Sequence, residues 1–382
     1  MKIRNLIGTV ALAVAATGVS AQQTVKLASL VELSGAGTTA GTAFRMGVDL
    51  AVKEINAGKG IMGRKIDMTT LDTQSNPGIA KGLTQKVIDQ DVFAIFGPVF
   101  SGSIMVSMSE SQRAEVPNFT GGEAAAITKQ GNPYVFRTSF TQADAIPKVV
   151  KYFNNTLKAK TVAVIYQNND FGKGGRDVFM KAIEGTSTKV VADISTEQAQ
   201  VDFSSAVLKA KQSNADAVFI YVTEEESARA LKEFKKQGFN KPLVGETTLT
   251  GQKVIELAGE AANGAIAHVG LTADAPNANI RAFKAKFQKE YSNFVPDHNA
   301  IKGYTGVYVL KAAIEKVGKF DRKEVAKAMH GIKILAKDQP GVLLDIAFDD
   351  KGDLDRESYF VQVKNGKQEV ITTFQPAFTS KK

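Results

Sequence analysis

Short runs of β-branched and aromatic residues alternate with segments whose apolar residues recur at helical spacing. The first run, residues 25–30, predicts a strand. Phe44, Val48 and Ile55 then share one face of a predicted helix that ends at Gly58. Further strands are predicted at 66–71, 92–96, 116–119, 161–166, 189–194, 217–222, 243–245, 265–269, 359–363 and 369–374. Further helices are predicted from Asn76-Pro77, after a Ser101 cap, and over 174–183, 204–213 with an Asp202 cap, 225–237, 279–291, 300–317 and 322–330.

Repeated strand–helix units predict parallel sheets with helices on both faces, and two such series predict two α/β lobes. The chain ends differently, because Asn365-Gly366 between two strand patterns is typical of a tight hairpin. In open α/β sheets, ligands bind beyond the carboxyl ends of the strands. The candidate ligand loops are therefore 32–42, 97–103, 120–125, 167–172, 223–226 and 246–250.

The first 21 residues have the pattern of a cleaved secretory signal. Lys2 and Arg4 precede an apolar run over 6–19, and Val19-Ser20-Ala21 forms a small-x-Ala end. A buried N-terminal helix is the alternative, but it would show a polar face. We expect a mature chain from Gln22 that is soluble and, in a bacterium with two membranes, periplasmic, because no second apolar segment approaches membrane length.

Composition narrows the function further. The chain has 43% hydrophobic residues, a formal net charge of +9 and no cysteine. The missing cysteines exclude thiol nucleophiles, thiolate metal sites and a lipid-anchored cysteine after the signal. Basic residues are scattered among acids without a stripe of interleaved aromatics, so a nucleic-acid partner is not expected. Export also argues against most ATP- or NAD-dependent functions.

Two glycine-containing loops could approach a ligand closely. Residues 35–41 follow a strand and open a helix with G-x-G-x-x-x-G spacing, but the acid expected about twenty residues on in a dinucleotide site is missing. A tight ligand-facing turn is the better interpretation. Ser101-Gly102 combines a hydroxyl with free N–H groups at a helix start, which suits an anion, although a plain serine N-cap explains it equally well.

Acidic residues follow several predicted strands. Gly121, Gly122 and Glu123 come after the fourth strand, where the glycines offer close backbone contact and the acid offers a charge partner. Other acids at strand ends are Glu224, Glu225, Glu226 and Glu246. Each could hold an ammonium group or could be an ordinary solvated loop acid, and the cluster is more informative than any one member.

Catalysis has little support in the sequence. His268, His298 and His330 are far apart and lack metal-ligand spacing, and no G-x-S-x-G elbow is present. We therefore expect neither a catalytic residue nor a metal or other cofactor. Paired carboxylates for glycoside chemistry remain open, but no specific pattern signals them.

A series of motifs along almost the whole mature chain resembles the type I periplasmic solute-binding proteins of ABC transporters, in the leucine/isoleucine/valine-binding family. Each motif is modest, and their order is specific. They are 31–35 (VELSG), 49–56 with 60–64 (GIMGR), Asp72 with Asn76-Pro77, Gly97-Pro98 with Ser101, Val116-Pro117, Ile127-Thr128, 136–138 (FRT), 170–172 (DFG), 202–204 (DFS) and 348–353 (FDDKGD).

The resemblance implies a type I periplasmic binding protein fold, with two Rossmann-like lobes joined by three hinge crossings near Phe140, Gly270 and Glu357. Lobe 1 would comprise residues 22–139 and 271–356, and lobe 2 residues 140–270 and 357–382, after a signal peptide over 1–21. It also implies a monomer that binds a small-molecule solute and delivers it to the membrane permease of an ABC importer.

Site roles carry over from the resemblance unevenly. Ser101, with Gly102, matches the family serine that holds an amino acid's carboxylate, and the loop 121–124 matches the segment that contacts carboxylate and ammonium. Phe171 matches an aromatic wall, and Thr247 falls near the acid that meets the ammonium. The chain departs from the family pattern at several positions. The loop has Gly-Glu-Ala, and Glu224 and Ala40 stand where aromatics are usual. Glu246 comes one residue before the family acid, and Ser75 and Phe100 stand where some relatives have a disulfide. These departures weaken an assignment to leucine.

The sequence leaves three functions open. The first is a non-enzymatic binding protein for a small polar solute, foremost a branched-chain type amino acid. The second is the same scaffold tuned to an aliphatic amide or to an aromatic or aliphatic carboxylate, which Ala40 and Glu224 motivate. The third, an exported enzyme, lacks a nucleophile or metal constellation.

Overall fold

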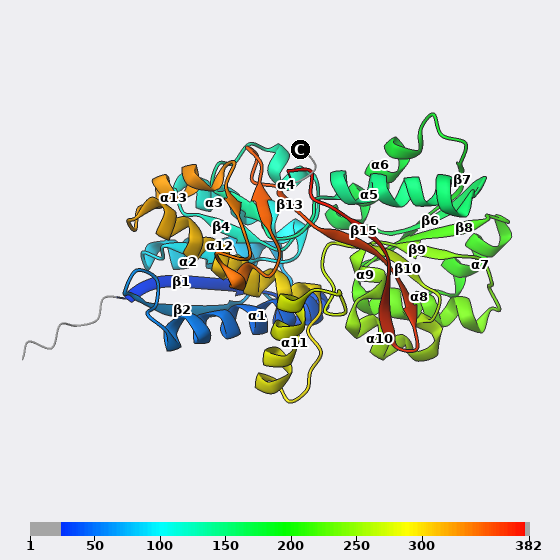
Figure 1. Cartoon of the computed structure of the whole chain (residues 1–382). Helices are drawn as coiled ribbons and strands as arrows, with labels where there is room; N and C mark the ends of the chain where they lie inside the picture. Colours follow the sequence, from blue (N-terminus) through cyan, green and yellow to red (C-terminus); the bar gives the residue numbers. More distant parts are fainter. Residues whose placement is uncertain (1–23, 379–382) are drawn as a thin grey trace, which may run out of the picture.

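The structure, a computed structural model, describes residues 24–378, so the predicted signal peptide lies outside the described residues. Two lobes lie side by side (Figure 1). The first lobe is built on a parallel sheet of five strands in the order β2-β1-β3-β4-β5. Its strands are β1 (Thr24–Val31), β2 (Lys65–Asp72), β3 (Ala94–Phe96), β4 (Asn118–Thr120) and β5 (Val135–Arg137). The sequence predicted the first four.

Helices cover both faces of this sheet, as the alternating pattern predicted. Asn76 accepts hydrogen bonds from the N–H groups of Gly78 and Ile79 (2.8 and 3.1 Å), which confirms the predicted helix start. The helices are α1 (Thr38–Ala57), α2 (Pro77–Asp89), α3 (Ser101–Arg113), α4 (Ala126–Lys129), α11 (Ala278–Glu290), α12 (His298–Val317) and α13 (Arg322–Met329). A small antiparallel sheet, β11 (Lys333–Ile334), β12 (Ile346–Phe348) and β13 (Leu354–Arg356), completes the lobe and was not predicted.

The second lobe is built on seven strands in the order β15-β14-β10-β9-β8-β6-β7. The five strands β6 to β10 are parallel, whereas β14 runs antiparallel to β10 and pairs with β15. Asn365 and Gly366 join that pair with positive φ angles of 49° and 73°, which confirms the predicted hairpin. The strands are β6 (Thr161–Gln167), β7 (Lys189–Thr196), β8 (Ala217–Tyr221), β9 (Leu243–Gly245), β10 (Ile266–Val269), β14 (Ser358–Lys364) and β15 (Lys367–Phe374).

Two helices of the second lobe, α6 and α8, begin earlier than the sequence predicted, because side chains cap them upstream. Asn169 accepts the N–H of Gly172 (2.9 Å), so α6 begins at Asp170, and Thr223 forms a capping box with Glu226. The helices are α5 (Gln142–Lys151), a π-helical turn (Tyr152–Leu157), α6 (Asp170–Ile183), α7 (Ser204–Gln212), α8 (Glu224–Lys236), α9 (Thr247–Thr250) and α10 (Gln252–Ala258).

The chain passes between the lobes three times: from β5 to α5, from β10 to α11 and from β13 to β14. The crossings touch one another, because Arg356 donates to the carbonyl of Gly270 (3.4 Å) and its guanidinium lies over the ring of Phe140. The carboxyl ends of the parallel strands of both sheets thereby face one region between the lobes. The residue boundaries of the lobes stay a prediction.

Candidate functional site

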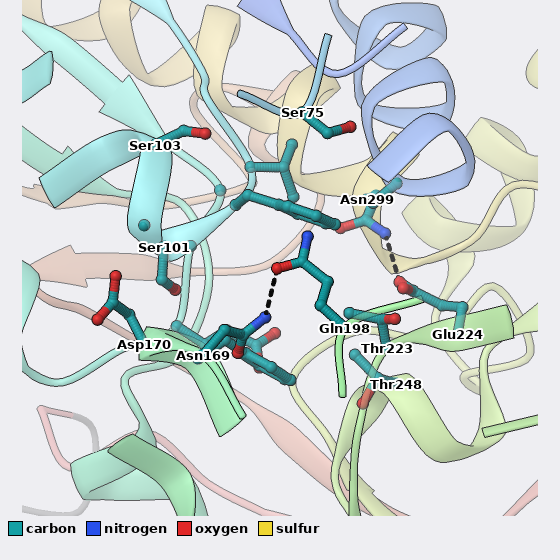
Figure 2. A pocket seen from close by; sticks show the side chains of 18 of the residues that line it. Ser75, Ser101, Ser103, Asn169, Asp170, Gln198, Thr223, Glu224, Thr248 and Asn299 are labelled. Atoms are coloured by element: carbon teal, nitrogen blue, oxygen red, sulfur yellow. Dashed lines mark hydrogen bonds between the residues drawn. The ribbon is translucent and has the colours of Figure 1, made fainter. Parts of the chain in front are cut away.

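A cavity of about 150 Å³ lies between the two lobes (Figure 2). The first lobe contributes the N-terminal ends of α1, α2, α3 and α12 and the loop after β4. The second lobe contributes the N-terminal ends of α6, α8 and α9 and the loop after β7. The lining residues are Ala40, Ser75, Pro77, Val99, Phe100, Ser101, Gly102, Ser103, Gly121, Gly122, Glu123, Asn169, Asp170, Phe171, Gln198, Thr223, Glu224, Thr248, His298, Asn299 and Lys302.

Helix α3 presents an uncapped N-terminus to this cavity. Phe100 occupies the cap position and supplies no side-chain hydrogen bond. The predicted cap by Ser101 is wrong, because Ser101 is the first helical residue and its hydroxyl accepts the N–H of Ala124 (3.2 Å). The Ser103 hydroxyl is buried and has no hydrogen-bond partner among the described residues. By contrast, side chains cap α6, α8 and α12, so α3 keeps its N–H groups available for an anion.

A buried carboxylate fixes the loop that leads into α3. Glu32 accepts hydrogen bonds from the N–H groups of Val99 (3.1 Å) and Phe100 (3.0 Å). Burial raises the pKa of Glu32 to about 7, although these two hydrogen bonds act in the opposite direction. Glu32 therefore sets the position of a loop that lines the cavity without lining it itself.

A buried ion pair lies at the first-lobe wall of the cavity. Lys302 Nζ is 2.9 Å from Glu123 Oε1, and the two side chains are only 5% and 9% exposed. Lys302 also donates to the carbonyl of Gly121 (3.4 Å), and the Tyr221 hydroxyl donates to Glu123 Oε2 across the lobes (3.4 Å). Burial raises the pKa of Glu123, and the charge of Lys302 opposes that change.

A second polar cluster joins the lobes at Glu224. Its Oε1 accepts a hydrogen bond from Asn299 Nδ2 (3.1 Å) and lies 3.6 Å from His298 Nε2. Burial, reinforced by the charges of Glu225 and Asp297, raises the pKa of Glu224 to about 8. Burial also lowers the pKa of His298 well below its usual range. Both groups are therefore neutral near pH 7.

Phe171 lines the cavity from the second lobe and packs on Tyr221, which is fully buried and does not line it. The rings of Phe171 and Tyr221 stack with their centroids 4.4 Å apart. Gln142 Nε2 holds both residues, donating to the carbonyl of Phe171 (2.8 Å) and to the Tyr221 hydroxyl (3.0 Å). The ring of Phe171, held in place by this stack, can cover a ligand from the second lobe.

The structure gathers most of the predicted site residues around the cavity. Those that line it are Ala40, Ser101, Gly102, Gly121, Gly122, Glu123, Phe171 and Glu224. Ala124, Glu246 and Thr247 do not line it. Ala124 contributes an N–H to Ser101 instead, whereas the Glu246 carboxylate accepts the N–H of Thr247 and contacts His268 Nδ1 (3.0 Å). Ligand contacts by the eight lining residues stay a prediction.

Sequence reasoning missed the contribution of α12. His298, Asn299 and Lys302 all line the cavity, yet this helix was assigned only a structural role. A signal was present, because Lys302 is the one Lys, Arg, Asp or Glu between Asp297 and Lys311 in a mostly apolar stretch, and a buried lysine there needs a partner. Thr248, whose buried hydroxyl has no partner among the described residues, lies in the predicted ligand loop 246–250 but was not among the predicted site residues.

The described residues contain no group of three or more His, Cys, Asp or Glu side chains arranged to hold a metal ion. Within residues 24–378, no helix is long and apolar enough to cross a membrane.

The raised pKa of Glu224 predicts a specific pH dependence of stability. The folded chain holds this proton up to about pH 8, whereas the unfolded chain releases it near pH 4.5, so rising pH favours unfolding. Between about pH 7 and pH 9 we expect the melting temperature of the closed form, in which Glu224 contacts Asn299 and His298, to fall. The Glu224→Gln variant, which cannot lose that proton, should fall less. If the melting temperatures of the two proteins fall in parallel across this range, the assignment is contradicted. Neutral His298 has the opposite effect on stability, but that effect changes with pH only below this range.

Two α/β lobes that meet around a cavity lined by polar and apolar side chains, with three crossings between them, define a solute-binding protein of the kind that holds its ligand between lobes. The family model described as periplasmic binding protein matches residues 24–368. The chain therefore belongs to the periplasmic binding protein family, whose members serve ABC transporters as solute-binding components.

Individual relatives agree with this assignment. A leucine-, isoleucine-, valine-, threonine- and alanine-binding protein of Pseudomonas aeruginosa is 26% identical over 357 residues, which cover 92% of this chain and 93% of the relative. The isoleucine complex of a branched-chain amino acid transporter substrate-binding protein from Streptococcus pneumoniae has a TM-score of 0.84 at 25% identity. The match covers 93% of this chain and 100% of that chain. A solute-binding protein of R. palustris in complex with benzoate has the same TM-score and identity, covering 92% and 97%.

Proposed function

We propose that this chain is the substrate-binding component of an ABC importer and captures an α-amino acid between its lobes. The observation that carries the proposal is the uncapped N-terminus of α3, with the hydroxyls of Ser101 and Ser103 beside it. Free N–H groups, the positive end of the helix dipole and two hydroxyls together suit the carboxylate of a ligand.

The ammonium group of an α-amino acid is attached to the same carbon as the side chain and the carboxylate, so its partner must lie close to Ser101. Glu123 meets this requirement, because the next residue, Ala124, donates its N–H to the Ser101 hydroxyl. Glu246 does not line the cavity, and Glu224 lies on the opposite side from Ser101 (Figure 2). We therefore place the ligand ammonium at Glu123, beside the Lys302 ammonium group that already pairs with its Oε1.

Ligand capture would close the lobes around the hinge formed by the three crossings, with lobes of 22–139 plus 271–356 and 140–270 plus 357–382. Contacts that cross the cleft support this closure. Thr39 of α1 donates to Glu225 of α8, and Asn299 donates to Glu224. Asp170 of α6 comes so near Gly102 that a Cβ there would lie 3.0 Å from its Oδ2.

An aromatic carboxylate is the second candidate. The ring of Phe171, which lines the cavity and stacks on Tyr221, favours it, because it offers a flat apolar surface to a ligand. Such a ligand needs no ammonium partner, which fits a Glu123 already engaged by Lys302. The benzoate-bound relative has this class of ligand.

The remaining properties follow from membership of the family and are part of the proposal. The protein would be exported to the periplasm by the signal over 1–21 and act there as a free monomer. Its partners would be the solute and the membrane permease of an importer, without nucleic acid. It would bind and release its ligand unchanged and so act as a carrier without enzymatic activity.

A thermal-shift screen of the amino acids and of substituted benzoates tests this function, since a ligand that binds only the folded protein must raise its melting temperature. For any carboxylate found, Ser101→Ala should weaken binding by about ten- to a hundredfold in calorimetry, because one hydrogen bond to a charged group contributes about 1.5–3 kcal/mol.

Ser107→Ala is the matched control, because its hydroxyl is buried in the same helix and donates to the Ser103 carbonyl away from the cavity. It should bind like the wild type. Equal affinities for Ser101→Ala and the wild type would show that the carboxylate lies elsewhere.

A further inference from the structure

The cavity has a second polar end, opposite the α3 N-terminus. In Figure 2, Ser101 and Ser103 lie on one side, and Glu224 and Asn299 lie on the other. His298 completes this second group, which we call the Glu224 subsite. Its three residues are at most 4% exposed, so these polar groups are desolvated in the closed protein and depend on one another or on a ligand for hydrogen bonds.

The Glu224 subsite is only partly satisfied by the protein. Both side-chain contacts, from Asn299 and from His298, use Oε1 of Glu224, the backbone N–H of Glu224 itself also acts on the carboxylate, and no other side chain of the described residues donates to Oε2. The subsite is assembled from both lobes, because Glu224 begins α8 whereas Asn299 and His298 begin α12. Near pH 7 the protonated carboxyl group of Glu224 can donate its proton to a carboxamide oxygen and accept from the carboxamide N–H, whereas an ammonium group pairs with the ionised carboxylate.

The surroundings provide room and polarity at this end. Ala40 on α1 has no side chain beyond Cβ and still lines the cavity. Thr223 and Gln198 lie beside Glu224 in Figure 2. An aliphatic side chain here would leave the carboxyl group without a partner, which weakens binding about tenfold or more.

We propose that the Glu224 subsite binds the end of the ligand's side chain. It thereby selects an amino acid whose side chain ends in an N–H donor, that is a carboxamide or an ammonium group, over an amino acid with an aliphatic side chain. This inference rests on the proposed function, because it takes the ligand's carboxylate to lie at α3. The expected ligand differs from the branched-chain amino acids that the names of the relatives state.

Calorimetry with four amino acids tests the inference. Glutamine and lysine carry the donor, whereas methionine and leucine have apolar side chains of comparable size. At least one of the first two should bind the wild-type protein tenfold or more tightly than both of the others. Glu224→Leu should remove or reverse that preference. Glu233→Leu is the matched control, because Glu233 lies on the same helix but bonds Gln237 and Lys236 at the surface, and it should keep the preference.

The two donors are distinguished by pH. Lysine affinity should rise between about pH 7 and pH 9, because an ionised carboxylate forms the stronger pair with an ammonium group, whereas glutamine affinity should not rise. Glu225, Asp297, His298 and Lys302 also act on Glu224, so the slope is compared with that of Glu224→Gln, which should lack it.

Tighter binding of leucine or methionine than of glutamine and lysine would overturn the inference, and so would an unchanged preference in Glu224→Leu. Either result leaves the proposed function intact, provided that Ser101→Ala still weakens amino-acid binding. If no amino acid binds and a benzoate does, the proposed amino-acid function fails first and the selection proposed here fails with it.

Discussion

Replacing Lys302 with methionine is expected to lower the free energy of unfolding by about 3–5 kcal/mol, because it leaves the carboxylate of Glu123 buried without its counter-charge. Burial of this pair is nearly complete, so solvent provides little screening. The second oxygen of Glu123 keeps only the 3.4 Å hydrogen bond from the Tyr221 hydroxyl. Urea denaturation of the ligand-free protein measures the change.

The double variant Lys302→Met/Glu123→Gln should recover much of that loss, because no charge is then left unpaired. Lys311→Met on the same helix is the matched control. Lys311 pairs with Glu315 at 2.7 Å, but the two side chains are 19% and 31% exposed, so its loss should cost no more than about 1 kcal/mol. Equal destabilisation by Lys302→Met and Lys311→Met would contradict the structural role assigned to the buried pair.

The architecture could be predicted because it depends on local patterns. Apolar periodicity and turn residues placed the first four strands, the helix start at Asn76 and the hairpin at Asn365-Gly366. Short elements without a period of their own were missed. The strand β5 (Val135–Arg137) has three residues, and Arg137 reads as a surface residue until its pairing with Asp353 (2.7 Å) is known.

The site could be predicted only where it follows directly after a strand. Ser101, Gly121, Glu123 and Glu224 come from such loops, and all of them line the cavity. Glu246 comes from one as well, but a tertiary contact with His268 removes its carboxylate from the cavity. That contact joins residues far apart in sequence, which no local pattern encodes.

The α12 residues were missed for a different reason. A helix reaches the cleft according to how closely it packs on its neighbour, and that distance depends on small residues in both helices. Gly303 of α12 packs on the carbonyl of Phe44 in α1, and Gly47 of α1 packs on the carbonyl of Ala300 in α12. This backbone-to-backbone contact places the N-terminal turns of α12, with Asn299 and Lys302, at the cavity.

Gly47→Ala is therefore expected to destabilise the protein by about 2–3 kcal/mol, at the upper end of the range for overpacked cores, although alanine favours a helix. The added Cβ would overlap the carbonyl oxygen of Ala300, a backbone atom that can move only if the two helices separate. Separation shifts the α12 N-terminus, so ligand affinity should fall together with stability. Thermal unfolding and calorimetry of the same variant measure both effects.

Gly82→Ala is the control with the opposite sign. Gly82 lies inside α2, and a Cβ there would meet nothing within 4 Å. Helix propensity alone then predicts stabilisation by roughly 0.5–1 kcal/mol, with unchanged ligand affinity. Gly303→Ala tests the same contact from α12, since its Cβ would overlap the carbonyl of Phe44. If Gly47→Ala and Gly303→Ala stabilise the protein as Gly82→Ala does, the helices are not in backbone contact, and the position of α12 at the cavity must have another cause.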